Sequence, residues 1–340
     1  MDLARLREQI GATIADHDFS GVVRIRLAGQ TVYEVAAGYA DRANRLPNTV
    51  TTRFGIASGT KFFTALAVGK LIEAGTVALD TRLCDVVDLG FDQYAPEITI
   101  QHLLTHTSGI PDYYDEELAD DFDNFSVGVP WSQLRGPRDY LAVFPKGPMK
   151  FAPGTRFSYS NGGYIALGIA IEALTGRAYR DFVTEEVLRP AGMMHSGFYA
   201  FNRLPGETAW GYIDEEDGWR TNIYNLPIIG ASDGGAYTTL DDMTQLWQAF
   251  WGERIVAPAL VALFTEPHAR AESEGEHAFY GHGIWIYDDG AGTREHYIEG
   301  CDAGVSFRSG RNLARDLEVT VISNTTGGAW PILETIRTAS

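Results

Sequence analysis

The most informative segment of the chain reads Phe54-Gly55-Ile56-Ala57-Ser58-Gly59-Thr60-Lys61. Apolar residues then recur at helical spacing between residues 62 and 72, and Gly75 follows as a stop signal. This pattern predicts a buried helix that begins at Ser58. Lys61 would then lie one turn after Ser58 on the same face, where its amine can reach the serine hydroxyl. Because a serine hydroxyl needs a neighbouring base before it can attack, the pair indicates an activated nucleophile.

A purely structural interpretation of the same two residues also stays open. Ser58 suits a helix cap, and Lys61 suits a solvated position in the first turn. A second segment, Tyr159-Ser160-Asn161, contributes a phenol and an amide that could serve the same site. Together the two segments favour a serine acyl-transferase or hydrolase over the structural interpretation.

Two further segments read Leu103-Leu104-Thr105-His106-Thr107-Ser108-Gly109-Ile110-Pro111 and Gly234-Gly235-Ala236-Tyr237-Thr238-Thr239-Leu240-Asp241-Asp242-Met243. With the Ser58 segment and Pro153-Gly154-Thr155-Arg156-Phe157-Ser158-Tyr159-Ser160-Asn161, they resemble the superfamily of serine β-lactamases, penicillin-binding proteins and family VIII esterases, particularly its class C-like branch. The four segments stand in the expected order, and the resemblance covers nearly the whole chain.

This resemblance implies a role for each matching residue. Ser58 would attack the acyl carbonyl, and Lys61 would ease the removal of its proton. Tyr159 would act as general base, either as a phenolate favoured by the Lys61 ammonium or through protons that it shares with Lys61. Asn161 would orient Lys61 and a polar group of the substrate; a turn residue beside Gly162 is the structural alternative.

The third motif of the superfamily, Lys or His followed by a small residue and Gly, is not matched. The corresponding residues are Ile298, Glu299 and Gly300, so the expected cation is absent. His296 stays a candidate, although two residues along a strand shift a side chain by about 6.6 Å. By resemblance, the backbone N–H groups of Ser58 and Cys301 would form an oxyanion hole that needs no particular side chain.

The missing cation also bears on the substrate. In relatives that act on β-lactams or peptides this strand helps to bind a carboxylate, whereas Glu299 here adds a negative charge. We therefore expect a β-lactamase-like serine hydrolase that works through a Ser58 acyl-enzyme, on an ester or amide in preference to a penicillin. The alternative is a penicillin-binding-like binding or sensory protein that kept the nucleophile segments but turns substrate over weakly or not at all.

Composition narrows the classes of partner, compartment and cofactor that we expect for this protein. The chain has 340 residues, 45% of them apolar, and a formal net charge of −18. An acidic surface disfavours nucleic acid or an anionic membrane as a partner. No signal-like or membrane-spanning run occurs, so we expect a cytoplasmic protein with two free cysteines, Cys84 and Cys301. No motif calls for a metal or cofactor; His102 and His106 have metal-ligand spacing but lack an adjacent glutamate.

Alternation of apolar residues predicts strands at both ends of the chain. The expected strands are a hairpin of residues 21–27 and 31–37, and residues 284–287, 295–299, 304–308 and 317–323, with a closing helix over 330–336. We expect one β-lactamase/transpeptidase-like α+β domain, residues 1–340, with an antiparallel sheet built from both termini and flanked by helices. Residues 1–80 and 201–340 would form the sheet lobe, and residues 81–200 an inserted, mainly helical lobe.

Overall fold

The computed structural model of the protein describes residues 2–118 and 121–339. The central element is an eight-stranded antiparallel sheet in the order β2-β1-β14-β13-β12-β11-β10-β9. These strands are β1 (Gly21–Leu27), β2 (Gln30–Ala37), β9 (Ala269–Arg270), β10 (Ala278–Tyr280), β11 (Trp285–Asp288), β12 (Arg294–Asp302), β13 (Val305–Asn312) and β14 (Leu317–Ser323).

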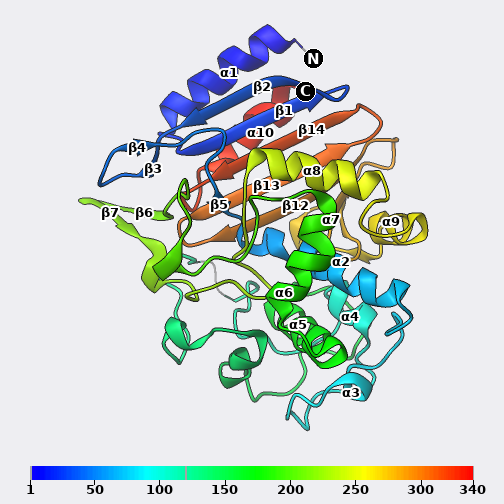
Figure 1. Ribbon diagram of the computed structural model, residues 1–340. Helices are drawn as coiled ribbons and strands as arrows, with labels where there is room; N and C mark the ends of the chain where they lie inside the picture. Colours follow the sequence, from blue (N-terminus) through cyan, green and yellow to red (C-terminus); the bar gives the residue numbers. More distant parts are fainter. Residues whose placement is uncertain (1, 119–120, 340) are drawn as a thin grey trace.

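The sheet joins the two ends of the chain, as the sequence predicts. Strand β1 pairs along its whole length with β14, from Gly21 opposite Ser323 to Leu27 opposite Leu317. Figure 1 shows the blue N-terminal strands β1 and β2 beside the orange C-terminal strand β14 within one sheet. The expected hairpin of β1 and β2 and the expected strand over residues 317–323 are confirmed. The fold is therefore mixed α and β around an antiparallel sheet.

Helices cover both faces of this sheet. One face carries α1 (Leu3–Asp16) and α10 (Ala329–Ala339), whose apolar residues, including Leu6 and Ile332, pack on β1 and β14. The other face carries α2 (Thr60–Glu73), α8 (Leu240–Trp251) and α9 (Pro258–Thr265). The segment expected to be mainly helical contains α3 (Leu83–Val86), α4 (Ile100–Leu104), α5 (Asn161–Thr175), α6 (Tyr179–Val183) and α7 (Arg189–Ala191).

Short two-stranded ladders stand beside the main sheet. They pair β3 (Tyr39–Asp41) with β4 (Leu46–Pro47), β5 (Phe54–Gly55) with β8 (Tyr237–Thr238), and β6 (Tyr212–Glu215) with β7 (Gly218–Thr221). The ladder of β5 and β8 holds the chain just before Ser58 against the segment that opens α8.

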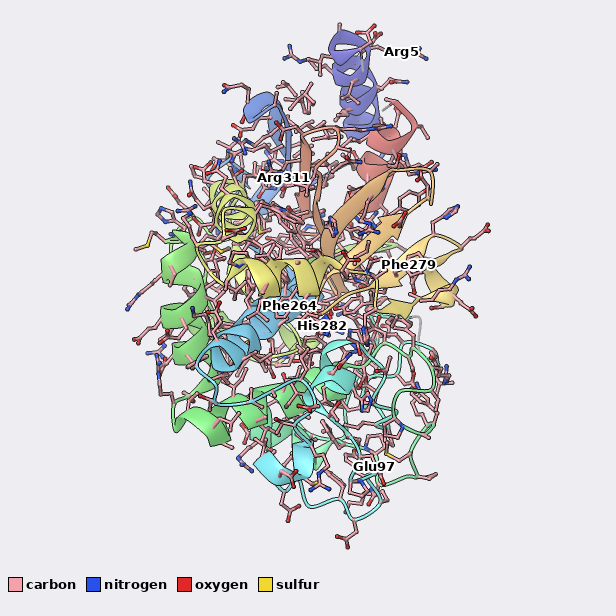
Figure 2. All side chains as sticks on the ribbon, turned by 90° about the vertical axis from the view of Figure 1, so that its right-hand side faces the viewer. Arg5, Glu97, Phe264, Phe279, His282 and Arg311 are labelled. Carbon is pink, nitrogen blue, oxygen red and sulfur yellow. The ribbon has the colours of Figure 1, made fainter. Side chains whose placement is uncertain are left out.

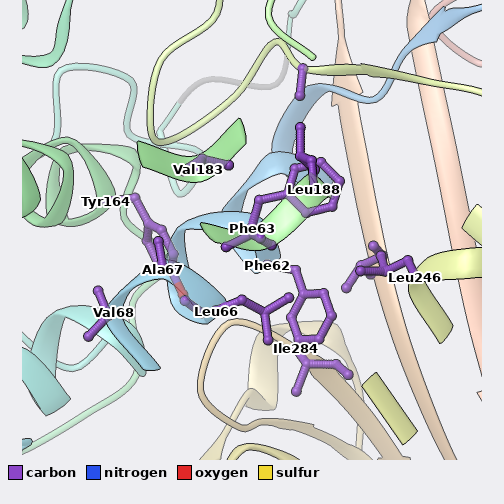
Figure 3. Close-up of a cluster of buried hydrophobic side chains, with 14 of the residues drawn as sticks. Phe62, Phe63, Leu66, Ala67, Val68, Tyr164, Val183, Leu188, Leu246 and Ile284 are labelled. Atoms are coloured by element: carbon purple, nitrogen blue, oxygen red, sulfur yellow. The ribbon is translucent and has the colours of Figure 1, made fainter. Parts of the chain in front are cut away.

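Helix α2 is the centre of the larger core. Most of its residues are buried, on all sides of the helix, as expected for a helix that is apolar all round. Figure 3 shows Phe62, Phe63 and Leu66 of α2 among side chains of other elements, including Leu188 and Ile284. This packing fixes the helix whose first turn follows the serine.

The start of this helix differs slightly from the sequence-based expectation. Ser58 lies in a short 3-10 turn, η1 (Ala57–Gly59), and α2 itself begins at Thr60. Ala57, just before the serine, has a left-handed φ of 45°. Such a conformation is strained for a residue with a β-carbon, and here it turns the chain sharply so that Ser58 leads into the helix.

Candidate active site

Lys61 is the best-buried charged group of the site, at 1% exposure. Its Nζ donates hydrogen bonds to Ser58 Oγ at 2.8 Å, to Asn161 Oδ1 at 2.7 Å and to the Asp233 carbonyl at 2.7 Å. Burial lowers the pKa of Lys61, and surrounding carboxylates, Asp233 first, oppose the shift. A lysine with a lowered pKa supplies a free amine more readily, which suits it to accept the proton of Ser58.

Asn161 begins α5 and is held from several sides. Its Nδ2 donates to the Tyr114 carbonyl and to Glu116 Oε1, while its Oδ1 accepts from Lys61. The backbone N–H groups of Asn161 and Gly162 donate to the buried carboxyl of Asp112. A carboxylate suits the positive end of a helix, so Asp112 anchors the turn that presents Asn161 to Lys61.

Tyr159 lies beside the same lysine. Lys61 Nζ is 4.8 Å from the centre of the Tyr159 ring, and the nearby Ser58 side chain acts to lower the pKa of the phenol. Burial raises the pKa of Tyr159 well above its ordinary value, and Glu116 adds to the shift. This direction is opposite to the expected phenolate, because desolvation is the largest cause of the shift and the Glu116 carboxylate acts in the same direction. Tyr159 is thus a neutral phenol beside Lys61.

Strand β12 passes directly against the nucleophile turn at Gly300. A β-carbon on Gly300 would lie 2.4 Å from the Ile56 carbonyl oxygen and 2.5 Å from Ser58 N, so no larger residue fits. This close approach brings the backbone of the following residue, Cys301, next to Ser58. The arrangement is consistent with the expected oxyanion hole from the N–H groups of Ser58 and Cys301.

The same part of β12 is open on one side. Strand β11 pairs with residues 294–297 of β12 and ends there. Residues 298–302 therefore lack a strand neighbour on that side within the described chain, whereas β13 accompanies them on the other. An open strand edge beside a nucleophile can hold an extended substrate by main-chain hydrogen bonds.

Glu299 and Cys301 line this open cleft together with Ser58, Glu116 and Tyr159. The charge of Glu299 is compensated, because its carboxylate lies 3.3 Å from Arg308 Nε across the ladder. Cys301 is a free thiol whose pKa burial raises above the ordinary value, which makes it a poor competing nucleophile. Cys84 is also free, as expected.

Two residues of the third-motif region are directed away from the cleft. Ile298 is buried in the main core, so it does not occupy a substrate-binding position. The His296 ring packs on Trp251, and its Nε2 bonds to the Thr265 carbonyl at 3.0 Å. Neither residue lines a cavity at Ser58, and the structure assigns His296 a packing position in place of a catalytic one.

A second cavity adjoins Ser58 on the other side of the nucleophile. Its walls are rich in aromatic rings: Tyr113, Tyr114, Phe122, Phe125, Trp131, Tyr140, Tyr199, Phe201 and Tyr237. Asp233, Asp302 and Glu116 also line it. Among the described residues that line the two cavities, there is no lysine, arginine or histidine. The space around the serine is therefore apolar and acidic.

Sequence reasoning missed three acidic residues of the site: Glu116, Asp233 and Asp302. Asp302 shows the effect of this setting most clearly, since burial raises its pKa to about 7. Asp233 accepts a hydrogen bond from the Tyr113 hydroxyl, and its carbonyl accepts from Lys61. Asp233 directly precedes the Gly234 segment, and Asp302 lies two residues after Gly300 of the third motif. Their closeness in sequence to these two segments was the signal that could have identified them as site residues.

The similarity of this chain to known proteins shows its family. The family model described as Beta-lactamase matches residues 6–336. The chain belongs to the beta-lactamase family. This beta-lactamase family member is 41% identical to a penicillin binding protein from Bacillus halodurans of known structure, with a TM-score of 0.91 over 97% of this chain and 100% of that one. It is 28% identical to the octameric penicillin-binding protein homologue from Pyrococcus abyssi, with a TM-score of 0.86 over 100% of this chain and 77% of that one.

More distant relatives differ in length or share the fold alone. Penicillin-binding protein 4* of Bacillus subtilis is 28% identical over 72% of this chain, and the chain spans 54% of that relative's length. The D-amino acid amidase of Ochrobactrum anthropi shares the fold, with a TM-score of 0.79 at 24% identity over 98% of this chain and 99% of that one.

In the described part of the chain, no three His, Cys, Asp or Glu side chains gather so that they could hold a metal ion. Over residues 2–118 and 121–339, none of the helices has the length and apolar character needed to cross a membrane.

Proposed function

We propose that this protein is a serine hydrolase that forms an acyl-enzyme at Ser58 and cleaves a small ester or amide. The observation that carries the proposal is the 2.8 Å hydrogen bond between Lys61 Nζ and Ser58 Oγ, made by a lysine whose burial lowers its pKa. An amine in this state can take the serine proton as Oγ attacks the acyl carbon.

The proposed cycle uses only groups already at the site. Ser58 Oγ bonds to the acyl carbon, and its proton moves to Lys61. The proton then passes, with Tyr159 as relay, to the departing alkoxide or amine as the bond to the leaving group breaks. In the second half-reaction the oxygen of a water molecule attacks the acyl carbon, one proton of that water passes through Lys61 and Tyr159 to Ser58 Oγ, and the bond between Oγ and the acyl carbon breaks to release the acid. The N–H groups of Ser58 and Cys301 would hold the negative oxygen in both halves.

The proposal extends to the charge of the substrate. A carboxylate next to the scissile bond would face Glu116, Asp233 and Asp302 with no cationic side chain among the described lining residues. Like charges about 4 Å apart cost roughly 1 to 4 kcal/mol between water-like and surface-like dielectric values. An uncharged or cationic acyl group, apolar enough for the aromatic wall, fits this setting better than a penicillin.

A direct comparison of substrates tests the proposal. The protein would be assayed with a short-chain nitrophenyl ester, amino acid amides and nitrocefin, and intact mass would be recorded after a fluorophosphonate probe. We expect turnover of the ester or an amide above that of nitrocefin, and an adduct that Ser58→Ala abolishes. Labelling without turnover would support the binding or sensory alternative. Labelling undiminished in Ser58→Ala would overturn the nucleophile.

A further inference from the structure

His106 is a buried histidine that the proposed cycle leaves without a role. Its exposure is 0%, and its backbone has a left-handed φ of 56°. Burial lowers its pKa well below the ordinary value, and the neighbouring charge of Lys61 adds to the shift. The ring is therefore neutral. Burying a polar imidazole and straining its backbone both cost free energy, so we expect specific contacts of His106 to compensate this cost.

The hydrogen bonds of His106 converge on the chain around Tyr159. The backbone N–H of Ser158 donates to the His106 carbonyl at 2.9 Å, and the N–H of Ser160 donates to His106 Nδ1 at 2.9 Å. Tyr159 lies between these two donors. Because Nδ1 accepts, the proton of the neutral ring is on Nε2, and that atom makes no hydrogen bond within the described structure.

The imidazole ring also contacts the phenol itself. The His106 and Tyr159 rings lie 4.2 Å apart at 34°, while Trp285 stacks on Tyr159 at 5.9 Å and 10°. Tyr164 and Tyr280 surround the imidazole at 5.0 and 4.6 Å. The Tyr159 ring is thus supported by an imidazole and an indole, and its backbone is fixed on both sides by one residue.

We propose that His106 is a positioning residue that sets Tyr159 against Ser58 and Lys61 through its hydrogen bond to the Ser160 N–H. This inference rests on the proposed function, in which Tyr159 relays a proton. Displacement of a reacting group by about 1 Å can lower a rate by about 100-fold. His106 lines neither cavity at Ser58, and its side-chain hydrogen bond goes to the residue next to Tyr159, so we expect its effect on the rate to pass through Tyr159.

Three variants separate the hydrogen bond from simple loss of packing. His106→Asn places an acceptor where Nδ1 stands and tolerates a positive φ, whereas His106→Ala removes the acceptor and the ring. His296→Asn is the matched control, because His296 is equally a buried histidine with one side-chain bond to the backbone, but its ring packs on Trp251 and not on Tyr159. Each would be assayed for kcat, KM and Tm with the nitrophenyl ester.

We expect His106→Ala to lower kcat by about 100-fold with little change in KM, and His106→Asn to regain at least about tenfold of that loss. His296→Asn should lower Tm and leave kcat within about threefold. Two results would contradict a role for the hydrogen bond to Ser160. One is a folded His106→Asn protein that loses as much kcat as His106→Ala, and the other is a loss of kcat that is proportional to the loss of Tm in all three variants.

The decisive measurement combines His106 with Tyr159. If His106 acts through the phenol, His106→Ala should lower the kcat of Tyr159→Phe by a smaller factor than it lowers the kcat of the parent protein. Equal factors in the two backgrounds would show a general structural role and overturn the inference. If His106→Ala does not fold, the kcat and Tm of His106→Asn, compared with those of His296→Asn, still decide. If the proposed function itself is wrong, the parent protein will show no turnover that depends on Ser58. That result separates failure of the proposed function from failure of the inference about His106.

Discussion

Lys61 Nζ lies 2.8 Å from Ser58 Oγ, and its two remaining hydrogen bonds also go to neutral oxygens, those of Asn161 and the Asp233 backbone. No carboxylate bonds directly to this nitrogen among the described residues. A buried ammonium without a bonded carboxylate is poorly compensated, which explains why burial dominates its pKa. The arrangement keeps the amine available as a base.

The first prediction concerns the pH dependence of acylation. Because the base must be neutral, kcat/KM should rise with pH through the pKa of Lys61, and this limb should lie below the ordinary lysine value of 10.5. Lys61→Met should remove the limb and lower kcat/KM by at least about 10⁴-fold. Lys70→Met, on the partly exposed end of the same helix, is the control. A limb at or above the ordinary value would contradict the lowered pKa.

The second prediction treats Lys61 and Tyr159 as one proton-transfer unit. Lys61→Ala and Tyr159→Phe should each lower kcat/KM strongly, and the double variant should lose little more than the worse single variant. The reason is that either loss interrupts the same proton path. Steady-state kinetics of the four proteins in one buffer would measure the coupling. Strictly multiplicative losses would mean that the two residues act independently.

The third prediction uses Asp302 to test the charge preference of the aromatic cavity. Its pKa of about 7 means that the carboxyl becomes charged as pH rises from 6 to 8. The ratio of kcat/KM for a cationic ester to that for a neutral ester of equal size should therefore rise over this range. Asp302→Asn should lower the ratio at pH 8 by about tenfold and flatten its pH dependence.

Asp80→Asn serves as the control for Asp302, because Asp80 is exposed and lines neither cavity at Ser58. Its ratio should match that of the parent at every pH. If both variants behave alike, the preference arises from the overall charge of −18 and not from the cavity.

The fourth prediction is a loss of stability in acid caused by His282. This side chain is buried against Phe264 of α9, with the rings 5.6 Å apart (Figure 2). Burial lowers its pKa to about 4, whereas the unfolded chain has the ordinary value of 6.5. The unfolded state thus binds more protons between these values, so the free energy of unfolding should fall as pH drops from 6.5 toward 4, by up to about 3 kcal/mol.

Urea unfolding between pH 4.5 and 7 would measure this effect. His282→Gln should reduce the slope of unfolding free energy against pH over the window, even if it lowers stability at pH 7. His17→Gln, at an exposed position, should leave the slope unchanged. A slope identical in parent and His282→Gln would assign the acid sensitivity to other groups.

Local spacing explains what could be predicted from the sequence. Ser58 and Lys61 are one turn apart, so the backbone places their side chains within reach of each other, and β1, β2 and β14 alternate clearly enough to be placed within a residue or so. Glu116 and Asp302 come to the site from a loop and a strand end, where periodicity carries no information about partners. Their position depends on tertiary packing.

The direction of the Tyr159 pKa could not be predicted for a related reason. The family resemblance places the Lys61 charge near the phenol, but the pKa depends on how much water the fold excludes from Tyr159, and desolvation is the largest cause of its rise. Likewise, alignment of the third motif places Ile298 where relatives have a cationic side chain. In the structure, the pleat of β12 directs Ile298 into the core and Glu299 into the cleft.

The pairing of β1 with β14 has a consequence for the order of folding. Strand β1 can pair with β14 only after a segment some 290 residues later has been synthesised. In the same way, the turn that holds Ser58 can pack against Gly300 only after β12 has been synthesised. Loop closure over such separations is slow, and contacts of this range delay the folding transition state. During synthesis at about 5 to 20 residues per second, Ser58 would exist for many seconds without the strand that packs against its turn. The proposed activity should therefore emerge only after β12 to β14 have joined the sheet.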